Sequence, residues 1–230
     1  MTFGGPSFGI SDIILNPLRV LSFWSMKNRA RLIGENGVHQ FVSNLQKVLP
    51  KGRLHLMGHS FGTIVTSSTV AGPNGSTPTP VQSLVLVQGA VSLWSYAATI
   101  PATGGTGFYY GALRQGMVNG PIVTTQSRFD LACRLWYPRA EELVDANPCL
   151  LGPVPNAPQY PEWGAMGTWG IQGSPANRIS MCDATCQYSF KNGQIYNLDA
   201  DQFICKGGGL TGAHSDISGP VSGPAVSHVI

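Results

Sequence analysis

The chain has 230 residues and a mass of 24.4 kDa, with 43% apolar and 11% charged residues. A charged fraction well below the roughly 25% of ordinary soluble domains excludes a disordered polyelectrolyte and a coiled coil. The formal net charge of +3 is small, and no recognition motif accompanies the basic residues, so we predict no nucleic-acid partner. The length fits one domain, 1–230, with a continuous core.

No window reaches the ~20 uninterrupted apolar residues of a membrane span, so we expect no transmembrane segment. The N-terminus lacks the basic region and apolar core of a signal peptide, which predicts a cytoplasmic protein, with secretion left open. The five cysteines cannot all pair. Unpaired buried thiols are favoured, and a disulfide between Cys182 and Cys186 stays open. No metal site and no cofactor are predicted.

Two helices are predicted near the N-terminus. Asn16 before Pro17 has the form of an N-cap and first helical residue, and the helix over 18–32 should end at Gly34. A second helix follows, because apolar residues recur there at i, i+3, i+4 and i+7 and should form a buried stripe. The stripe consists of Val38, Phe41, Val42, Leu45, Val48 and Leu49.

Short apolar runs that alternate with helical stretches indicate strands of a parallel sheet. Runs that are apolar on both faces predict an α/β fold, a doubly wound and mostly parallel sheet with helices on both faces. The expected strands are 54–57, 83–88, 122–126 and 194–198, with a buried helix over 63–70.

The interval from Leu54 to Leu113 contains no Asp, Glu, Lys or Arg. One interpretation of this uncharged interval is a central sheet with its packing helices. A more specific hypothesis is that 90–120, rich in glycine and aromatic residues, lines an apolar cleft. The stretch 137–191 is predicted to be an insertion that covers the sheet edge or the site, because its tryptophans seek burial.

One motif carries chemistry: Gly58-His59-Ser60-Phe61-Gly62 fits G-x-S-x-G, with a strand leading in and a helix leading out. In this context the serine has a strained backbone, and side chains at either glycine would collide with the neighbouring chain. The Phe61 amide, at the start of the helix, would donate to an oxyanion. A second match at 5–9 has no such context, so we regard it as chance.

A serine hydroxyl needs a base, usually a histidine held by an acid. Of the five histidines, His214 follows the last predicted strand on a glycine-rich loop and is the candidate base. His59 is expected to point away from the nucleophile in a structural role, but we keep it beside Phe61 as a candidate oxyanion or substrate-binding residue. The remaining histidines, expected to be structural or exposed, are His39, His55 and His228.

With this motif the chain resembles the alpha/beta-hydrolase superfamily over 38–130 and 194–230. The superfamily order of nucleophile, acid and histidine implies that Asp130, after the strand 122–126, orients His214. The alternative for Asp130 is a surface cap for the helix starting at Leu131. The reserve acids are Asp145, Asp199 and Asp201, and Asp216 lies too close to His214 along the chain to be preferred.

The resemblance is short at the N-terminus, since few residues precede the nucleophile strand. Two alternatives stay open: either the first strands of the superfamily are missing, or Gly4-Gly5-Pro6 is a remnant of the oxyanion loop. The implied activity is a serine hydrolase that cleaves a small-molecule ester, uncharged or acyl-bearing, through an acyl-enzyme. An amide or peptide substrate, and acyl transfer to an acceptor other than water, stay open. The alternative is a catalytically silent, hydrolase-like interaction protein, and an oligomer is left open.

Overall fold

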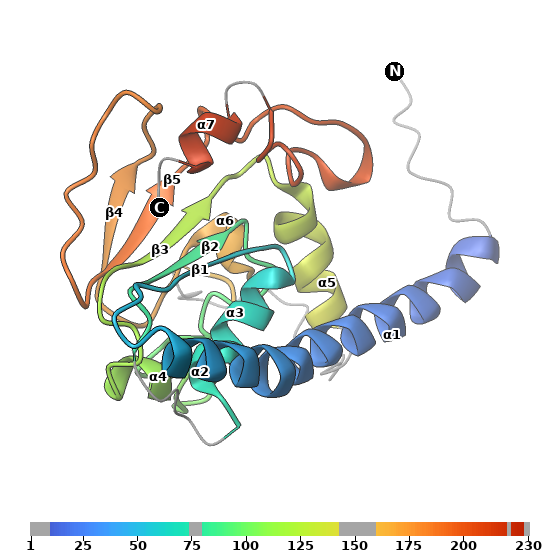
Figure 1. The fold of residues 1–230 in the computed structure, drawn as a ribbon. Coiled ribbons are helices and arrows are strands. Elements are labelled where there is room, and N and C mark those ends of the chain that lie inside the picture. The colour runs from blue at the N-terminus through green and yellow to red at the C-terminus, as the bar shows by residue number, and fades with distance from the viewer. Residues whose placement is uncertain (1–9, 74–79, 143–159, 220–221, 228–230) are drawn as a thin grey trace.

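The computed structural model describes residues 10–73, 80–142, 160–219 and 222–227. A five-stranded, all-parallel sheet with helices packed against it confirms the predicted α/β class (Figure 1). The strand order is β1-β2-β3-β5-β4. The strands are β1 (His55–His59), β2 (Ser83–Val87), β3 (Ile122–Gln126), β4 (Ala176–Ser180) and β5 (Ile195–Asp199).

The central strands β2 and β3 are buried throughout, as a parallel sheet covered on both faces requires, although β3 (IVTTQ) buries two threonines and a glutamine as well as apolar residues. In β2, Leu84 and Leu86 belong to a core that includes residues of α3 (Gly62–Ala71), whereas Val85 and Val87 belong to a second core with residues of α7 (Ser222–Ser227). The shorter helices are α4 (Tyr110–Arg114), α5 (Tyr137–Glu142), α6 (Met166–Trp169), the π-helical η2 (Ala132–Trp136) and the 3-10 helix η4 (Gly209–Thr211).

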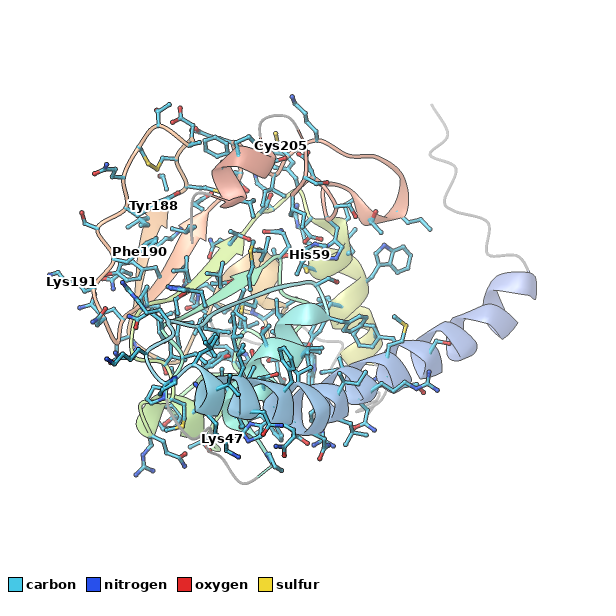
Figure 2. All side chains as sticks on the ribbon, viewed as in Figure 1. Lys47, His59, Tyr188, Phe190, Lys191 and Cys205 are labelled. Atoms are coloured by element: carbon cyan, nitrogen blue, oxygen red, sulfur yellow. A yellow bond between two sulfur atoms is a disulfide. The ribbon has the colours of Figure 1, made fainter. Side chains whose placement is uncertain are left out.

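Strand β4 was not predicted, and it lies inside the expected insertion 137–191. Its sequence, ANRIS, is largely exposed, so it has no apolar run to reveal it. It pairs in parallel with β5 at the edge of the sheet. The connection from β4 to β5 carries Tyr188 and Phe190, whose rings stack with centroids 4.8 Å apart (Figure 2).

The two predicted N-terminal helices form one continuous helical segment. The helix α1 (Ile10–Ile33) passes through the π-helical η1 (Gly34–Val38) into α2 (His39–Val48). Asn16 therefore lies inside a helix, so the predicted start was wrong, whereas α1 ends at Ile33, next to the predicted end at Gly34, but gives way to a π-helical turn that was not predicted. Gly34 is needed for packing, because a Cβ there would fall on the Val65 carbonyl oxygen of α3 and 2.7 Å from Ser68 Cβ.

The predicted apolar stripe of the second helix is only partly buried. Val42 is buried, but Phe41, Val48 and Leu49 are 65%, 76% and 51% exposed. The buried face of α2 consists of Val42, Ser43 and Gln46. A π-helical turn holds an extra residue, so η1 shifts the register of α2 relative to a continuous α-helix.

The cysteines divide into a bonded pair and free thiols. A disulfide joins Cys182 to Cys186. The pairing that the sequence left open is therefore present, and the favoured prediction of unpaired thiols was wrong at these two positions. Cys133 is a buried free thiol and Cys205 a half-buried one, while Cys149 lies outside the described residues. Among the helices that the structure describes, none combines the length and the apolar character needed to cross a bilayer.

Candidate active site

Ser60 stands at a sharp turn between β1 and α3 with a positive φ of 56°, so the predicted backbone strain is present. Its amide donates to the Val87 carbonyl (3.1 Å), which fixes the turn against β2. A Cβ on Gly58 would fall on the Gly62 carbonyl and 2.8 Å from the Thr63 nitrogen, which explains the first glycine of the motif. The expectation for the second was wrong, because a Cβ on Gly62 meets no atom within 4 Å.

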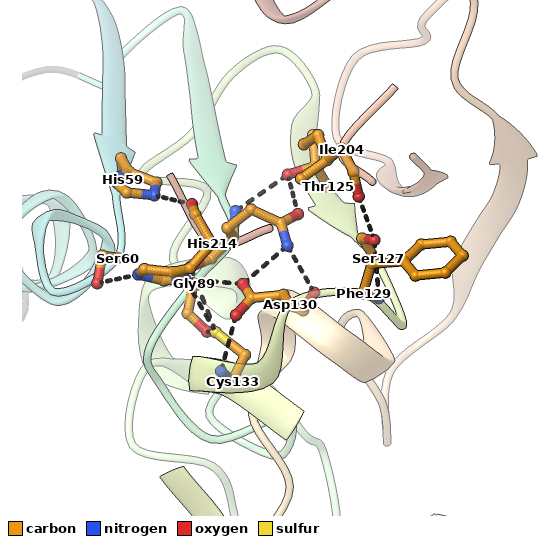
Figure 3. Close-up of polar contacts among 12 residues, drawn as sticks. His59, Ser60, Gly89, Thr125, Ser127, Phe129, Asp130, Cys133, Ile204 and His214 are labelled. Atoms are coloured by element: carbon orange, nitrogen blue, oxygen red, sulfur yellow. Dashed lines mark hydrogen bonds and ion pairs between the residues drawn. The ribbon is translucent and has the colours of Figure 1, made fainter. Parts of the chain in front are cut away.

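The structure brings Ser60, His214 and Asp130 together in a hydrogen-bonded series (Figure 3). His214 Nε2 lies 2.8 Å from Ser60 Oγ, and His214 Nδ1 lies 2.8 Å from Asp130 Oδ2. The carboxyl group of Asp130 is fully buried. In a neutral imidazole, Nδ1–H donates to the carboxylate, which leaves Nε2 to accept the serine proton.

The glycine-rich loop can approach the acid turn because of Gly212. This residue has a φ of 58°, and a Cβ there would lie 2.6 Å from Leu131 Cγ. The close approach lets the amide of Ala213 donate to the Phe129 carbonyl (2.9 Å). This backbone hydrogen bond holds the chain just before His214 beside the turn that carries Asp130.

Asp130 accepts two further hydrogen bonds. The Cys133 amide donates to Oδ1 (2.9 Å), and the Gln88 side-chain Nε2 donates to Oδ2 (2.9 Å). The hydrogen bond from the Cys133 amide caps the start of the following helix. Asp130 therefore also acts as a helix cap, the alternative that the sequence left open. The cap is buried, however, and not on the surface.

The other candidate acids and histidines bond elsewhere. Asp199 pairs with Arg178 and Asp201 with Arg128, while Asp216 accepts from the amides of the loop at 205–206. The ring nitrogens of His39 and His55 contact the Thr69 carbonyl and Ser83 Oγ, each at 2.8 Å. Outside the described residues lie Asp145, His228, Gly4-Gly5-Pro6 and the second motif match at 5–9.

His59 contacts the loop that carries the candidate base. Its Nε2–H donates to the His214 carbonyl (3.0 Å), and the two imidazole rings lie 4.8 Å apart. Burial lowers the pKa of His59, so the ring is held neutral. These contacts agree with the structural expectation for His59, and an oxyanion or substrate-binding role stays a prediction.

Phe61 is the N-cap residue of α3. Amides at a helix N-terminus lack the usual acceptor four residues back, and here those of Thr63 and Ile64 donate instead to the carbonyls of Ser60 and Phe61 (3.1 and 3.0 Å). The role of the Phe61 amide as an oxyanion donor stays a prediction. The Phe61 ring packs against Phe23 of α1, with centroids 5.3 Å apart.

One cluster has the residue types of a metal site. The ligand atoms of Asp130, Cys133 and His214 lie within 4.8 Å of one another. Burial raises the pKa of the Cys133 thiol well above its ordinary value, which disfavours the thiolate that binds metals. His214 Nδ1 and Asp130 are also bonded to each other, so an ion here would have to break that bond.

An apolar pocket of about 440 Å³ lies between α1 and the segment after β2. Two of its lining residues adjoin the Ser60 turn. Ile64 is one turn along α3 from Phe61, and Val91 follows Ala90, whose amide donates to the Ser60 carbonyl (3.3 Å). The stretch 90–120 therefore does line a cleft. The lining includes Trp24, Ile64, Val91, Trp94, Ile100 and Phe108.

The sequence interpretation missed the residues around the acid, above all Gln88, Thr125 and Cys133. The only signal for Gln88 was a polar residue at the end of the apolar run SLVLVQ. Compared with protein-family models, with curated proteins and with solved structures, the chain has no significant match.

Proposed function

We propose that the protein is a serine hydrolase of the alpha/beta-hydrolase type that cleaves carboxylic esters. The observation that carries the proposal is the series Ser60 Oγ, His214, Asp130, with both hydrogen bonds at 2.8 Å. The strained backbone of Ser60 supports it further, because strain of this kind persists where the surrounding structure imposes it and is concentrated at functional sites.

In the proposed reaction, His214 Nε2 takes the proton of Ser60 as Oγ bonds to the ester carbonyl carbon. The amide of Phe61 stabilises the oxyanion. The bond to the leaving alcohol then breaks, and the alcohol takes the proton from His214, which leaves an acyl group on Ser60. Water attacks this acyl group, again losing its proton to His214, and the carboxylic acid leaves as the proton returns to Ser60 Oγ.

Asp130 fixes the tautomer of His214 and stabilises the imidazolium that forms in each step. Its burial supports this role, because an ion pair in a low-dielectric environment interacts more strongly than one in water. The proposed substrate is an ester with an apolar acyl or alcohol group, since most of the accessible lining of the pocket next to the turn is apolar, although Lys27 and Arg31 of α1 also line it.

Hydrolysis of p-nitrophenyl esters of two to eight carbons tests the proposal. We expect turnover by the wild-type chain, reduced at least about 10³-fold in Ser60→Ala. The fold of the variant is checked by circular dichroism. Turnover that survives in Ser60→Ala would assign the activity to another group or a contaminant, and no turnover of any ester by the wild type would remove the support for esterase activity.

A second candidate is the hydrolase-like interaction protein. The exposed apolar side chains of α1 and α2, notably Phe41 and Val48, favour a surface that associates with a partner. This candidate predicts that Ser60→Ala leaves association unchanged and that no ester is turned over. Sedimentation of the wild type and Ser60→Ala at several concentrations, beside the ester assay, separates the two candidates.

A further inference from the structure

We infer that Gln88 is a positioning residue for the acid of the candidate triad, so that the site has four linked side chains. The inference rests on the proposed function, because it assigns Gln88 a role in the reaction of Ser60. Gln88 follows β2, the strand between β1, which leads to Ser60, and β3, which leads to Asp130. Its side chain therefore starts next to both strands and extends the series beyond Asp130.

Every polar atom of the Gln88 side chain has a partner. Nε2 donates to Asp130 Oδ2 (2.9 Å) and to the Gly167 carbonyl (3.1 Å), and Oε1 accepts from Thr125 Oγ1 (2.9 Å). Turning the amide over would place Oε1 against two oxygens, so these contacts fix its orientation. The residue is fully buried, where an unpaired amide is costly.

The backbone of Gln88 is also held in an unfavourable conformation. Among the described residues, Ser60 and Gln88 are the two non-glycine residues with positive φ, 56° and 44°. The backbone amide of Gln88 donates to Thr125 Oγ1 (3.0 Å), the same hydroxyl that holds its side chain. Thr125, on β3, is therefore hydrogen-bonded to both the backbone and the side chain of Gln88 (Figure 3).

These contacts assign a chemical role. Asp130 Oδ2 accepts hydrogen bonds from both Gln88 Nε2 and His214 Nδ1. The carboxylate therefore cannot rotate away from the imidazole without also losing the hydrogen bond from the Gln88 amide. The amide stabilises the ionised carboxylate without adding charge. Without this donor the carboxylate would be more basic. Protonation of the carboxylate itself, or of the imidazole that it faces, would then be more favourable.

The test measures how fast a fluorophosphonate probe labels Ser60 between pH 5 and 9. In Gln88→Leu we expect labelling at pH 7 to slow about 10-fold or more, the size of a lost hydrogen bond to a charged group. The acid limb of the pH profile should move to higher pH. Thr125→Val removes the hydroxyl that holds Gln88 and should move the limb in the same direction by less.

Tyr96→Phe is the control. It removes another buried hydrogen bond, from Tyr96 Oη to Ser67 Oγ (2.7 Å), away from Asp130, and should leave the pH profile unchanged. An unshifted limb in both Gln88→Leu and Thr125→Val overturns the inference, even if labelling is uniformly slower. If Gln88→Leu does not fold, Thr125→Val decides alone. If the wild type itself is not labelled, the proposed function fails and the inference with it.

Discussion

At the scale of single residues, the site depends on unusual backbone conformations at the ends of two adjacent strands. Ser60 and Gln88 are both strained, and each directs a side chain toward the His214–Asp130 pair. The G-x-S-x-G motif predicts the strain at Ser60 because the motif describes that turn. It contains no information about Gln88, since the need for an amide donor depends on a carboxylate 42 positions away in sequence.

The two glycines of the motif should respond differently to substitution. We expect Gly58→Ala to lower the free energy of unfolding by about 1–3 kcal/mol, because its Cβ would fall on backbone atoms of Gly62 and Thr63. Gly62→Ala, its matched control, should be neutral or stabilising by up to about 1 kcal/mol, because its Cβ enters open space in a helix. Urea unfolding measures both, and equal losses would contradict the explanation.

His59 should make the fold sensitive to acid. Burial lowers its pKa from the ordinary value of 6.5, and the nearby His214 lowers it further while the His214 carbonyl and Asp130 raise it. The unfolded chain thus takes up the proton first, so the free energy of unfolding should fall as the pH drops below 6.5 and level off below the folded-state pKa.

His59→Gln keeps a donor for the His214 carbonyl but cannot titrate. Its free energy of unfolding should therefore depend less on pH between 7 and 5 than that of the wild type, as measured by urea unfolding at each pH. An equal or steeper dependence in the variant would contradict the role given to His59.

At the scale of elements, the sequence predicts what has a strong local pattern. Strands β2 and β3 and helix α3 are confirmed within a residue or two because each has a run of apolar or β-branched residues without a charge. Strand β4 escapes prediction because it lies at the sheet edge and needs no apolar face. Glycine at position 34 predicts the end of α1 but not the π-helical turn that follows, because it also serves a contact with α3, which local sequence does not reveal.

Substitution of two glycines in η1 tests this contact. Gly34→Ala should lower the free energy of unfolding by about 1–3 kcal/mol, because its Cβ would force η1 away from Val65 and Ser68. Gly37→Ala, in the same segment but with no atom within 4 Å of its Cβ, should raise it by about 0.4–1 kcal/mol. Equal loss of stability in both variants would contradict the explanation, because Gly37 has no packing contact that an added Cβ could disturb.

The segment after β2 should determine acyl-chain selectivity. Val91→Phe places a larger side chain in the wall of the pocket of about 440 Å³ beside the Ser60 turn and so reduces the free volume. We expect kcat/KM for an octanoyl ester to fall about 10-fold, with little change for an acetyl ester, because a few methylenes in an apolar pocket contribute about that factor. Parallel losses for both esters would indicate that substrates bind elsewhere.

At the scale of the whole molecule, the sheet topology assembles the site, and no local sequence pattern specifies that topology. Parallel strands β1, β3 and β5 end at one edge of the sheet, which brings Ser60, Asp130 and His214 together from positions up to 154 residues apart. The order of the three along the chain, together with the resemblance, was enough to nominate them. The residues that hold them, Gln88 and Thr125, follow only from the packed structure.

The central claim is that Ser60 is an activated nucleophile, and covalent labelling tests it most directly. After incubation with a fluorophosphonate, intact-mass measurement and peptide mapping should find one adduct per folded chain, on Ser60. The adduct should be absent from Ser60→Ala and form at least about 10³-fold more slowly in His214→Gln. No adduct on the folded wild type, or an adduct on a different serine, would contradict the account.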